Sequence, residues 1–243
     1  MKKSLIYVCA ACIVCAAVYT GCGSDAKTVK RMQALEEGVS NPTTPEELSA
    51  AISKYEKRVA DVIVADQQIG IWYKILGTRY LDNQMYAKAL DAFRKATEYY
   101  PANQNLYYYV GVCAGFMANQ ALDFNATGST AQKYNYLKLA EAAYLRALEL
   151  EPRYARALYG LGVLYVFELD EPAKAIAYLE TLLSIETRHT DGMFVLARAY
   201  YATYQFDQAA AMYDKIIATT TSPEKKAEAE ANKKIVLDAA YAQ

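Results

Sequence analysis

The chain has 243 residues, enough for one ordinary domain or one short array of repeats. Its net charge of −1 does not favour a nucleic-acid partner, because nucleic-acid binding needs a clustered basic face, and we expect none. Apolar residues make up 54% and can form a buried core, while 23 Tyr and only six Pro favour long helices with half-buried faces.

Residues 1–21 have the composition of a signal peptide. Lys2 and Lys3 give a positive start, and the apolar run over residues 5–19 is short for a membrane span. The run leads into Tyr-Thr-Gly-Cys, which resembles a bacterial lipobox although Tyr19 stands where Leu, Val or Ile is usual. The resemblance implies that Cys22 is acylated, as with palmitate, and holds the protein on a lipid bilayer of the bacterial cell envelope, facing the periplasm. A signal peptide cut at another small residue is the alternative.

A tether and a helix are predicted next. Residues 22–44 contain Gly, Ser, Asn and Pro, which indicates a linker behind the lipidated cysteine. Thr44 is a good N-cap, Pro45 suits a first helical turn, and the two Glu that follow favour the positive end of a helix. Apolar residues at helical spacing extend this helix over residues 45–69, where we expect it to pack against the domain that follows.

From residue 70 the sequence repeats. Small, aromatic and apolar residues recur at fixed places within residues 70–103, and a proline closes the unit. The signature positions are Tyr73, Leu76, Gly77, Tyr80, Ala89, Phe93, Ala96 and Pro101. This pattern resembles the tetratricopeptide repeat (TPR), with Tyr73 in place of the usual Trp. The resemblance implies two antiparallel helices per unit, small residues where the helices cross, and units that bury their apolar faces by stacking.

The second unit, residues 104–154, carries an insertion. The step from Gly111 to Gly162 is 17 residues longer than the 34-residue TPR period, so we place 17 extra residues between its two helices. Apolar residues continue at helical spacing on both sides of a turn-rich break, which predicts two lengthened helices around residues 117–133. The insertion is either a partner-docking arm or a tolerated surface feature.

Two more units and a cap complete the predicted array. Residues 155–189 contain one extra residue, which we place in the turn near Glu171, and residues 190–223 end at Pro223. Residues 224–243 are rich in Lys and Glu and predict a C-terminal capping helix. The expected fold is therefore an all-α, right-handed TPR solenoid of about four helix pairs between an N-terminal helix and a C-terminal cap. The residues expected to shape the repeat packing are Gly77, Ala89, Pro101, Gly111, Ala140, Pro152, Gly162, Ala175, Ala197 and Ala209.

The TPR resemblance also implies a binding face. The first helix of each pair lines a concave inner face, where a segment of a partner protein binds. The inner-face residues here are Lys74, Thr78, Tyr108, Val112, Arg156, Tyr159, Val163, Phe194, Arg198 and Tyr201. Their aromatic rings form a candidate stripe of the kind that anchors interfaces. The alternative is that the chain ends or the insertion fold back over these rings.

No residue pattern in the sequence indicates catalysis, and we expect no enzyme activity, metal or cofactor. A zinc site needs three or four clustered ligands. His189 is the only histidine and Cys113 the only cysteine of the predicted domain, so the sequence offers no His and Cys cluster, and no Ser or Cys nucleophile has a motif that supplies a base. The leading hypothesis is a membrane-anchored adaptor or scaffold in envelope assembly or secretion. One alternative is a ligand-handling or partner component of a periplasmic solute transporter, and another is a protein that stacks end to end with itself.

Overall fold

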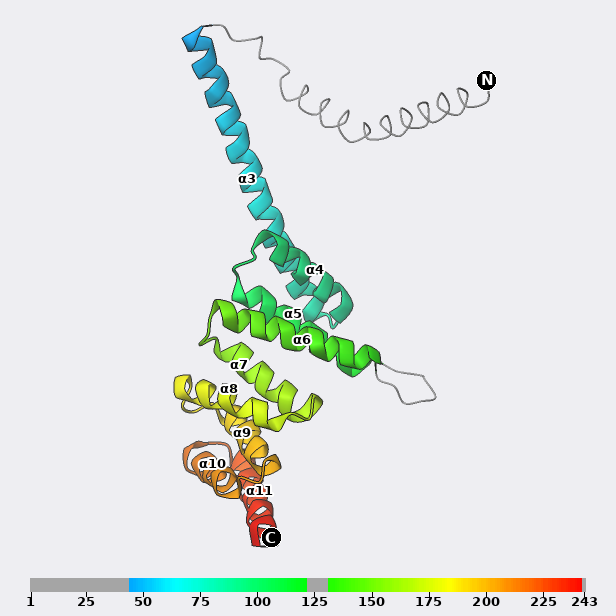
Figure 1. Cartoon of the computed structure of the whole chain (residues 1–243), viewed down its shortest axis with the longest axis vertical. Coiled ribbons are helices and arrows are strands. Elements are labelled where there is room, and N and C mark those ends of the chain that lie inside the picture. The colour runs from blue at the N-terminus through cyan, green and yellow to red at the C-terminus, as the bar shows by residue number, and fades with distance from the viewer. Residues whose placement is uncertain (1–43, 122–130, 242–243) are drawn as a thin grey trace, which may run out of the picture. The chain divides into compact units, whose positions relative to one another are not determined.

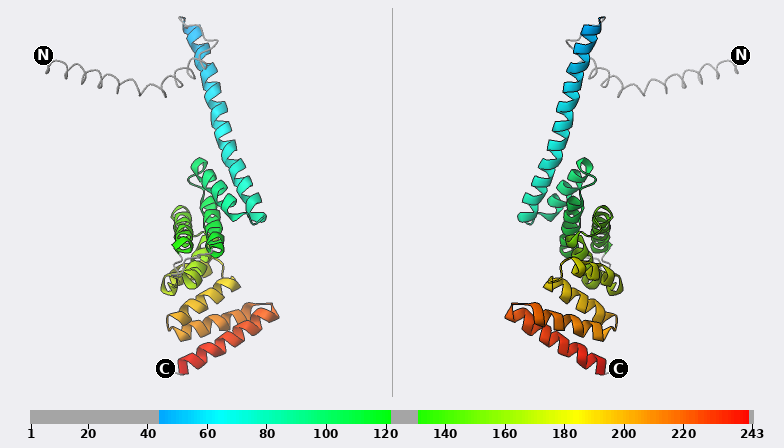
Figure 2. Two further views of the ribbon diagram at one scale, coloured as in Figure 1. Left: turned by 90° about the vertical axis from the view of Figure 1, so that its right-hand side faces the viewer. Right: turned by 90° about the vertical axis from the view of Figure 1, so that its left-hand side faces the viewer.

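The computed structural model describes residues 44–121 and 131–241. Within these ranges the chain forms nine α-helices and one short π-helix, and it contains no strand, which confirms the predicted all-α class. The chain divides into two compact units, with the boundary between Ile63 and Val64 inside the first described helix. In the second unit, consecutive helices run back and forth beside one another (Figures 1 and 2).

Helix α3 (Pro45–Asp82) corrects the predicted break between a helix over 45–69 and the first repeat, because it continues through both. Its start is a capping box, in which the Glu47 amide donates to Thr44 Oγ1 and the Thr44 amide donates to Glu47 Oε2, both at 3.2 Å. A single Gly70 does not end a helix, since it costs only about 1 kcal/mol relative to alanine. Gly70 serves packing instead, because an added Cβ there would lie 2.6 Å from the Tyr100 ring.

The packing predicted for residues 45–69 stays a prediction along most of this segment, although the Tyr100 hydroxyl donates to the Gln67 carbonyl at 2.9 Å. No residue in that part of α3 is buried, and its large apolar side chains are exposed. Gly70 and Gly77 are the only buried residues of the helix. The helical spacing of apolar residues was therefore sufficient to predict the helix itself.

The remaining helices form pairs within the second unit. Outside the second repeat, each pair consists of a first helix, a three-residue connection and a second helix, as the repeat predicts. The helices are α4 (Tyr86–Tyr99), α5 (Gln104–Gln120), α6 (Ala131–Leu150), α7 (Ala155–Val163) continued by the π-helix η2 (Leu164–Glu168), α8 (Pro172–Ile185), α9 (Thr190–Ala202), α10 (Phe206–Thr219) and α11 (Pro223–Tyr241). Helices α5 and α6, with 17 and 20 residues, are longer than α9 and α10, with 13 and 14. The second repeat thus has two lengthened helices, whereas the connection between them lies outside the described residues.

Glycines mark the crossings of the helix pairs. An added Cβ at Gly77 would lie 2.9 Å from the Phe93 ring, and one at Gly111 would lie 2.5 Å from the Tyr144 ring. At Gly162 the Leu179 side chain is equally close. Only a residue without a side chain lets a ring or a leucine approach the backbone in this way. The alanines at the other predicted packing positions, Ala89, Ala140, Ala175, Ala197 and Ala209, are fully buried, whereas Pro101 and Pro152 are exposed just after α4 and α6.

The turns inside the first, third and fourth repeats are alike. Gln84, Asp170 and Tyr204 have φ values of 59°, 53° and 61°, and each is the middle residue of a three-residue turn. The following amide donates back to a tyrosine carbonyl, as in Met85 to Tyr80 and Gln205 to Tyr200, both at 2.8 Å. The shared backbone geometry shows that the turn of the third repeat has the ordinary length.

The extra residue of the third repeat lies in η2 and not in the turn near Glu171, where it was predicted. The Leu169 amide donates to the Leu164 carbonyl at 3.0 Å, a step of five residues that is typical of a π-helix. A π-turn takes up one residue within an otherwise α-helical segment. Sequence periodicity counts the extra residue, but it does not distinguish between a wider helical turn and a longer loop.

Pro223 begins the last helix and does not end the fourth repeat. Helix α10 ends at Thr219, and Pro223 is the first residue of α11, where its missing N–H costs nothing. The Ser222 hydroxyl accepts from the Lys225 amide at 3.2 Å and caps the helix. Helix α11 buries only Ala229 and Val236, so most of its residues, including its many Lys and Glu, are not buried, as expected for a cap.

Tyrosine–glutamate hydrogen bonds join neighbouring repeats. The Tyr165 hydroxyl donates to Glu141 Oε1 at 2.8 Å, and the Tyr200 hydroxyl donates to Glu180 Oε1 at 2.6 Å. Burial and the bonded carboxylate raise the pKa of Tyr200 to about 12. These two rings are nearly covered while their hydroxyls are satisfied, which explains how the core accommodates both tyrosines.

Two further properties limit what the described residues can do. Cys113 is fully buried, and burial raises the pKa of its thiol to about 12, so it is a core residue and not a reactive thiol. Among the described helices, none is both long enough and apolar enough to cross a bilayer. The predicted anchor, Cys22, lies outside the described residues.

Candidate functional site

An aromatic and cationic cluster lies where the second and third repeats meet. The Tyr108 ring packs edge-on against Tyr154, with the centroids 5.9 Å apart, and the Arg156 guanidinium lies 5.9 Å from the Tyr108 centroid. The Tyr154 hydroxyl donates to Asn105 Oδ1 at 2.5 Å. Burial raises the pKa of Tyr108, and the nearby Arg156 charge opposes that rise. Tyr108 is half-buried, so part of its ring remains open to a partner.

Tyr159 forms a second contact point, one repeat further along. Its ring centroid lies 5.0 Å from that of His189. His189 is the N-cap of α9, because its Nδ1 accepts from the Gly192 amide at 2.9 Å. Burial and the charge of Asp191 raise the pKa of Tyr159, while Lys225, which pairs with Asp191 at 2.6 Å, lowers it. The only histidine therefore has a structural role in this arrangement.

The fourth repeat presents two more of the predicted rings. Phe194 packs against Tyr213 at 6.1 Å between centroids, and Tyr201 packs against Phe206 at 5.8 Å. The Arg198 guanidinium lies 5.5 Å from the Tyr201 centroid, a cation–π distance. Phe194 and Tyr201 are half-buried, whereas Arg198 is exposed.

The predicted stripe is therefore a series of separate sites. Among the ring contacts of the described residues, none joins two of Tyr108, Tyr159, Phe194 and Tyr201. Each ring is held by residues of its own or a neighbouring repeat, and an exposed Arg accompanies the first and the last. At the N-terminal end, Lys74 is exposed and the Thr78 hydroxyl donates to the Lys74 carbonyl at 3.0 Å. This end of the predicted face carries no aromatic anchor from the predicted set.

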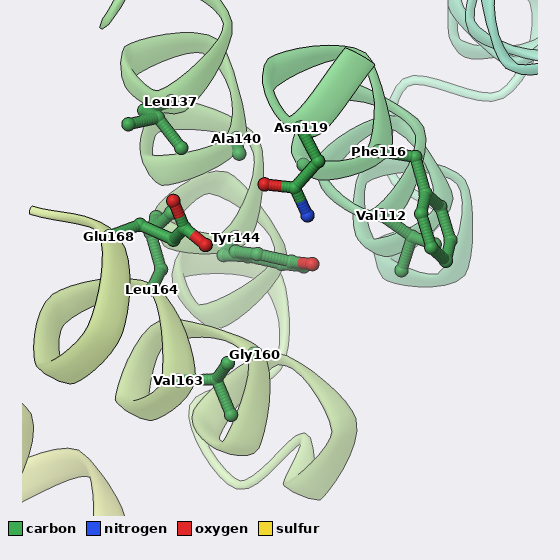
Figure 3. A pocket seen from close by; sticks show the side chains of 11 residues that line it. Val112, Phe116, Asn119, Leu137, Ala140, Tyr144, Gly160, Val163, Leu164 and Glu168 are labelled. Carbon is green, nitrogen blue, oxygen red and sulfur yellow. The ribbon is translucent and has the colours of Figure 1, made fainter. Parts of the chain in front are cut away.

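A cavity of about 190 Å³ lies between α5, α6 and the α7–η2 segment. Val112 and Val163, both predicted as inner-face residues, line it together with Leu137, Ala140 and Leu164. Tyr144 forms one wall, and its ring also lies against Gly111 of α5 and Gly160 of α7. Figure 3 shows the Asn119 amide and the Glu168 carboxylate pointing toward each other across the space beside this ring.

The polar groups of the cavity differ in their surroundings. The Glu168 carboxylate pairs with Lys133 Nζ at 3.0 Å and keeps about a quarter of its side chain exposed, at 27%. Asn119 is exposed, and its side chain offers both a donor and an acceptor. Burial raises the pKa of the Tyr144 hydroxyl, which therefore stays neutral and can act as a donor. The cavity is thus mainly apolar, with hydrogen-bonding groups on its rim.

Sequence reasoning found only part of this cavity. Val112 and Val163 were predicted from their places in the repeat, whereas Asn119, Gly160 and Glu168 were not. Asn119 lies in the part of α5 that extends beyond the ordinary first helix, and Glu168 lies in η2, so neither has a helical counterpart in the first or fourth repeat. In the described part of the chain, no group of three or more His, Cys, Asp or Glu side chains is arranged to hold a metal ion.

Family models and a relative of known sequence both identify the same repeat family. Family models described as tetratricopeptide repeat match residues 166–227 and residues 76–114 with 137–188, which together cover more than half of the chain. The chain is similar to a TPR repeat-containing protein of Borreliella burgdorferi, with 22% identity over 219 residues that cover 88% of this chain and 93% of that protein.

Solved structures agree on the fold. A thermophilic TPR protein of Thermus thermophilus has a TM-score of 0.53 and 21% identity, over 78% of this chain and 94% of its own. YrrB, described as a TPR protein with an unusual peptide-binding site, has a TM-score of 0.53 and 20% identity, over 76% of this chain and 87% of its own. At these identities the likeness establishes the helical-repeat fold alone.

Proposed function

Because the chain belongs to the tetratricopeptide-repeat family, we propose that it is an adaptor that holds a segment of a partner protein against the inner face of its repeats. The observation that carries this proposal is the set of half-buried rings on the first helices of the repeats, with Tyr108 beside Arg156 and Tyr201 beside Arg198. Tyr and Arg are favoured as interface anchors because they combine a large contact area with hydrogen bonds. A rigid array of such anchors suits an extended or helical segment.

The spacing of the anchors supports a long partner segment. Tyr108, Tyr159 and Phe194 belong to successive repeats, and each ring is fixed by contacts to its neighbours before any partner binds. A preorganised surface loses little side-chain entropy on binding, which favours affinity. The separation of the clusters means that a partner must reach across several repeats to contact all of them.

The test is capture of the partner by a variant that lacks two anchors. Replacing Tyr159 and Phe194 with alanine should reduce capture at least tenfold, because anchor truncations often cost about 2 kcal/mol or more. A photo-crosslinking residue at Arg198 in intact cells would identify the partner, and a pull-down with the purified variant would measure the loss. The helicity of the variant should equal that of the parent protein.

The matched control removes two rings outside the inner face. Tyr134 and Tyr241 are exposed, at 53% and 89%, and their replacement by alanine should leave capture unchanged. Unchanged capture in the Tyr159→Ala and Phe194→Ala double variant would refute the inner-face assignment.

We further propose that the adaptor works at the bacterial envelope, anchored through acylated Cys22. The lipobox-like sequence supports this location, and two acyl chains would give stable attachment where one chain is marginal. Cys22→Ala should abolish labelling with radioactive palmitate and move the protein from the membrane to the soluble fraction.

The control for the anchor is Cys113→Ala, which removes a buried cysteine and should leave both labelling and membrane attachment unchanged. Membrane attachment that persists in Cys22→Ala after a carbonate wash would contradict the proposed anchor.

A further inference from the structure

The cavity between α5, α6 and η2 owes its polar rim to the two places where the repeat is irregular. In the first and fourth repeats the turn begins after the thirteenth residue, at Asn83 and Thr203. Asn119 is the sixteenth residue of its repeat and is still helical because α5 is extended. Glu168 is the fourteenth residue of its repeat and is helical because of η2. Without the two insertions, neither side chain would be held on a helix at the cavity.

Besides the polar rim, the open space beside Gly115 indicates that the cavity binds a ligand. It lines the cavity in the interior of α5, where a glycine costs about 1 kcal/mol relative to alanine. An added Cβ at Gly115 would meet nothing within 4 Å, so no neighbour in the structure requires a glycine there. Every other described glycine has a heavy atom within 3 Å of its added Cβ, as seen at Gly70, Gly77, Gly111, Gly160, Gly162 and Gly192. The missing side chain of Gly115 keeps space open for something other than the protein itself.

The size and walls of the cavity indicate a single ring. An apolar cavity of about 150 Å³ is sufficient for benzene, so about 190 Å³ fits one ring with a small substituent. The Tyr144 ring in the wall favours an aromatic partner, which can pack against it edge-on or offset. At the rim, the Glu168 carboxylate accepts hydrogen bonds, and its pairing with Lys133 leaves further lone pairs available.

We propose that this cavity binds a tyrosine side chain of the partner segment, with the ring beside Tyr144 and the phenol donating to Glu168. The proposal rests on the adaptor function proposed above and adds the identity of one anchor residue on the partner. A hydrogen bond to a charged group is among the stronger ones, and a site built for a hydroxyl discriminates against a ligand that lacks it.

The test uses two probes that differ only in the hydroxyl, N-acetyl-tyrosinamide and N-acetyl-phenylalaninamide. Titration of the ¹⁵N-labelled protein should shift the amide signals of Gly115 and Gly160, with about tenfold tighter binding of the tyrosine probe. Gly115→Leu should abolish these effects on the remaining Gly160 signal, because the leucine fills the space that the probe needs. Gln120→Leu, which adds a leucine on the same helix outside the cavity lining, should bind the tyrosine probe as the parent protein does.

The outcomes separate this proposal from the adaptor function. Probes that leave both glycine signals unshifted, or that bind equally tightly, would overturn the tyrosine site. In the pull-down, Gly115→Leu should lose at least tenfold in capture while Gln120→Leu does not. Full capture by Gly115→Leu, together with loss of capture by the Tyr159→Ala and Phe194→Ala variant, would overturn the tyrosine site and leave the adaptor function in place.

Discussion

Replacing Gly111 with alanine should destabilise the protein by about 1–3 kcal/mol, the usual range for overpacking a core. The new Cβ would lie 2.5 Å from the Tyr144 ring, far inside van der Waals contact. The ring has little room to move away, because the same ring lies against Gly160 of α7, where an added Cβ would be 2.8 Å away. One ring thus fixes the spacing of α5, α6 and α7. Thermal unfolding followed by circular dichroism should show a midpoint several degrees lower.

The matched control is an identical substitution one helical turn away. Gly115→Ala introduces a Cβ into open space on the same helix and should stabilise the protein by up to about 1 kcal/mol, because alanine is the better helix former. If the free energy of unfolding falls for Gly111→Ala and rises for Gly115→Ala, packing at Gly111 outweighs helix propensity. A destabilised Gly115→Ala, or an unaffected Gly111→Ala, would contradict the described contacts.

Phe93→Ala should cost about 3–5 kcal/mol, and the loss should be confined to the N-terminal repeats. Phe93 is fully buried against Gly77, and its ring stacks on Tyr109 with the centroids 4.8 Å apart. In a repeat array each unit contacts mainly its neighbours, so the damage does not have to spread along the chain. Hydrogen exchange should show faster exchange in α4 and α5, while α9 and α10 keep their protection.

The complementary variant is Met193→Ala, which truncates a fully buried side chain of α9. It should reverse the pattern, with faster exchange in α9 and α10 and unchanged protection in α4. Equal loss of protection along the whole array in either variant would mean that the repeats unfold as one cooperative unit.

The repeat period predicted most of the fold because it depends on local packing. Gly77, Gly111 and Gly162 recur at fixed places in the sequence, and the structure places a ring or a leucine against each of them. The period could not predict the continuity of α3, because Gly70 resembles a unit boundary although it serves the packing of Tyr100. Nor could it place the extra residue of the third repeat in η2, since a wider helical turn and a longer loop add the same residue.

The candidate site was predictable only where it follows the repeat. Val112 and Val163 occupy regular positions, and both line the cavity. Asn119 and Glu168 lie in the two irregular segments. Whether their side chains face the same cavity therefore depends on how the insertions fold, which no spacing in the sequence predicts. The open space beside Gly115 could be recognised only from the positions of the surrounding atoms. In the sequence, a glycine that lets a neighbour pack closely looks the same as a glycine that leaves a space empty.

The exposure of α3 has a spectroscopic consequence. Trp72, the only tryptophan of the chain, is 60% exposed on this helix. Its indole should emit at the long wavelength typical of contact with water, and denaturant should change that emission little, so tryptophan fluorescence is a poor monitor of unfolding for this protein. The same property makes Trp72 a built-in reporter of binding, since a molecule that covers its indole would shift the emission to shorter wavelength. No other tryptophan of the chain contributes to that signal.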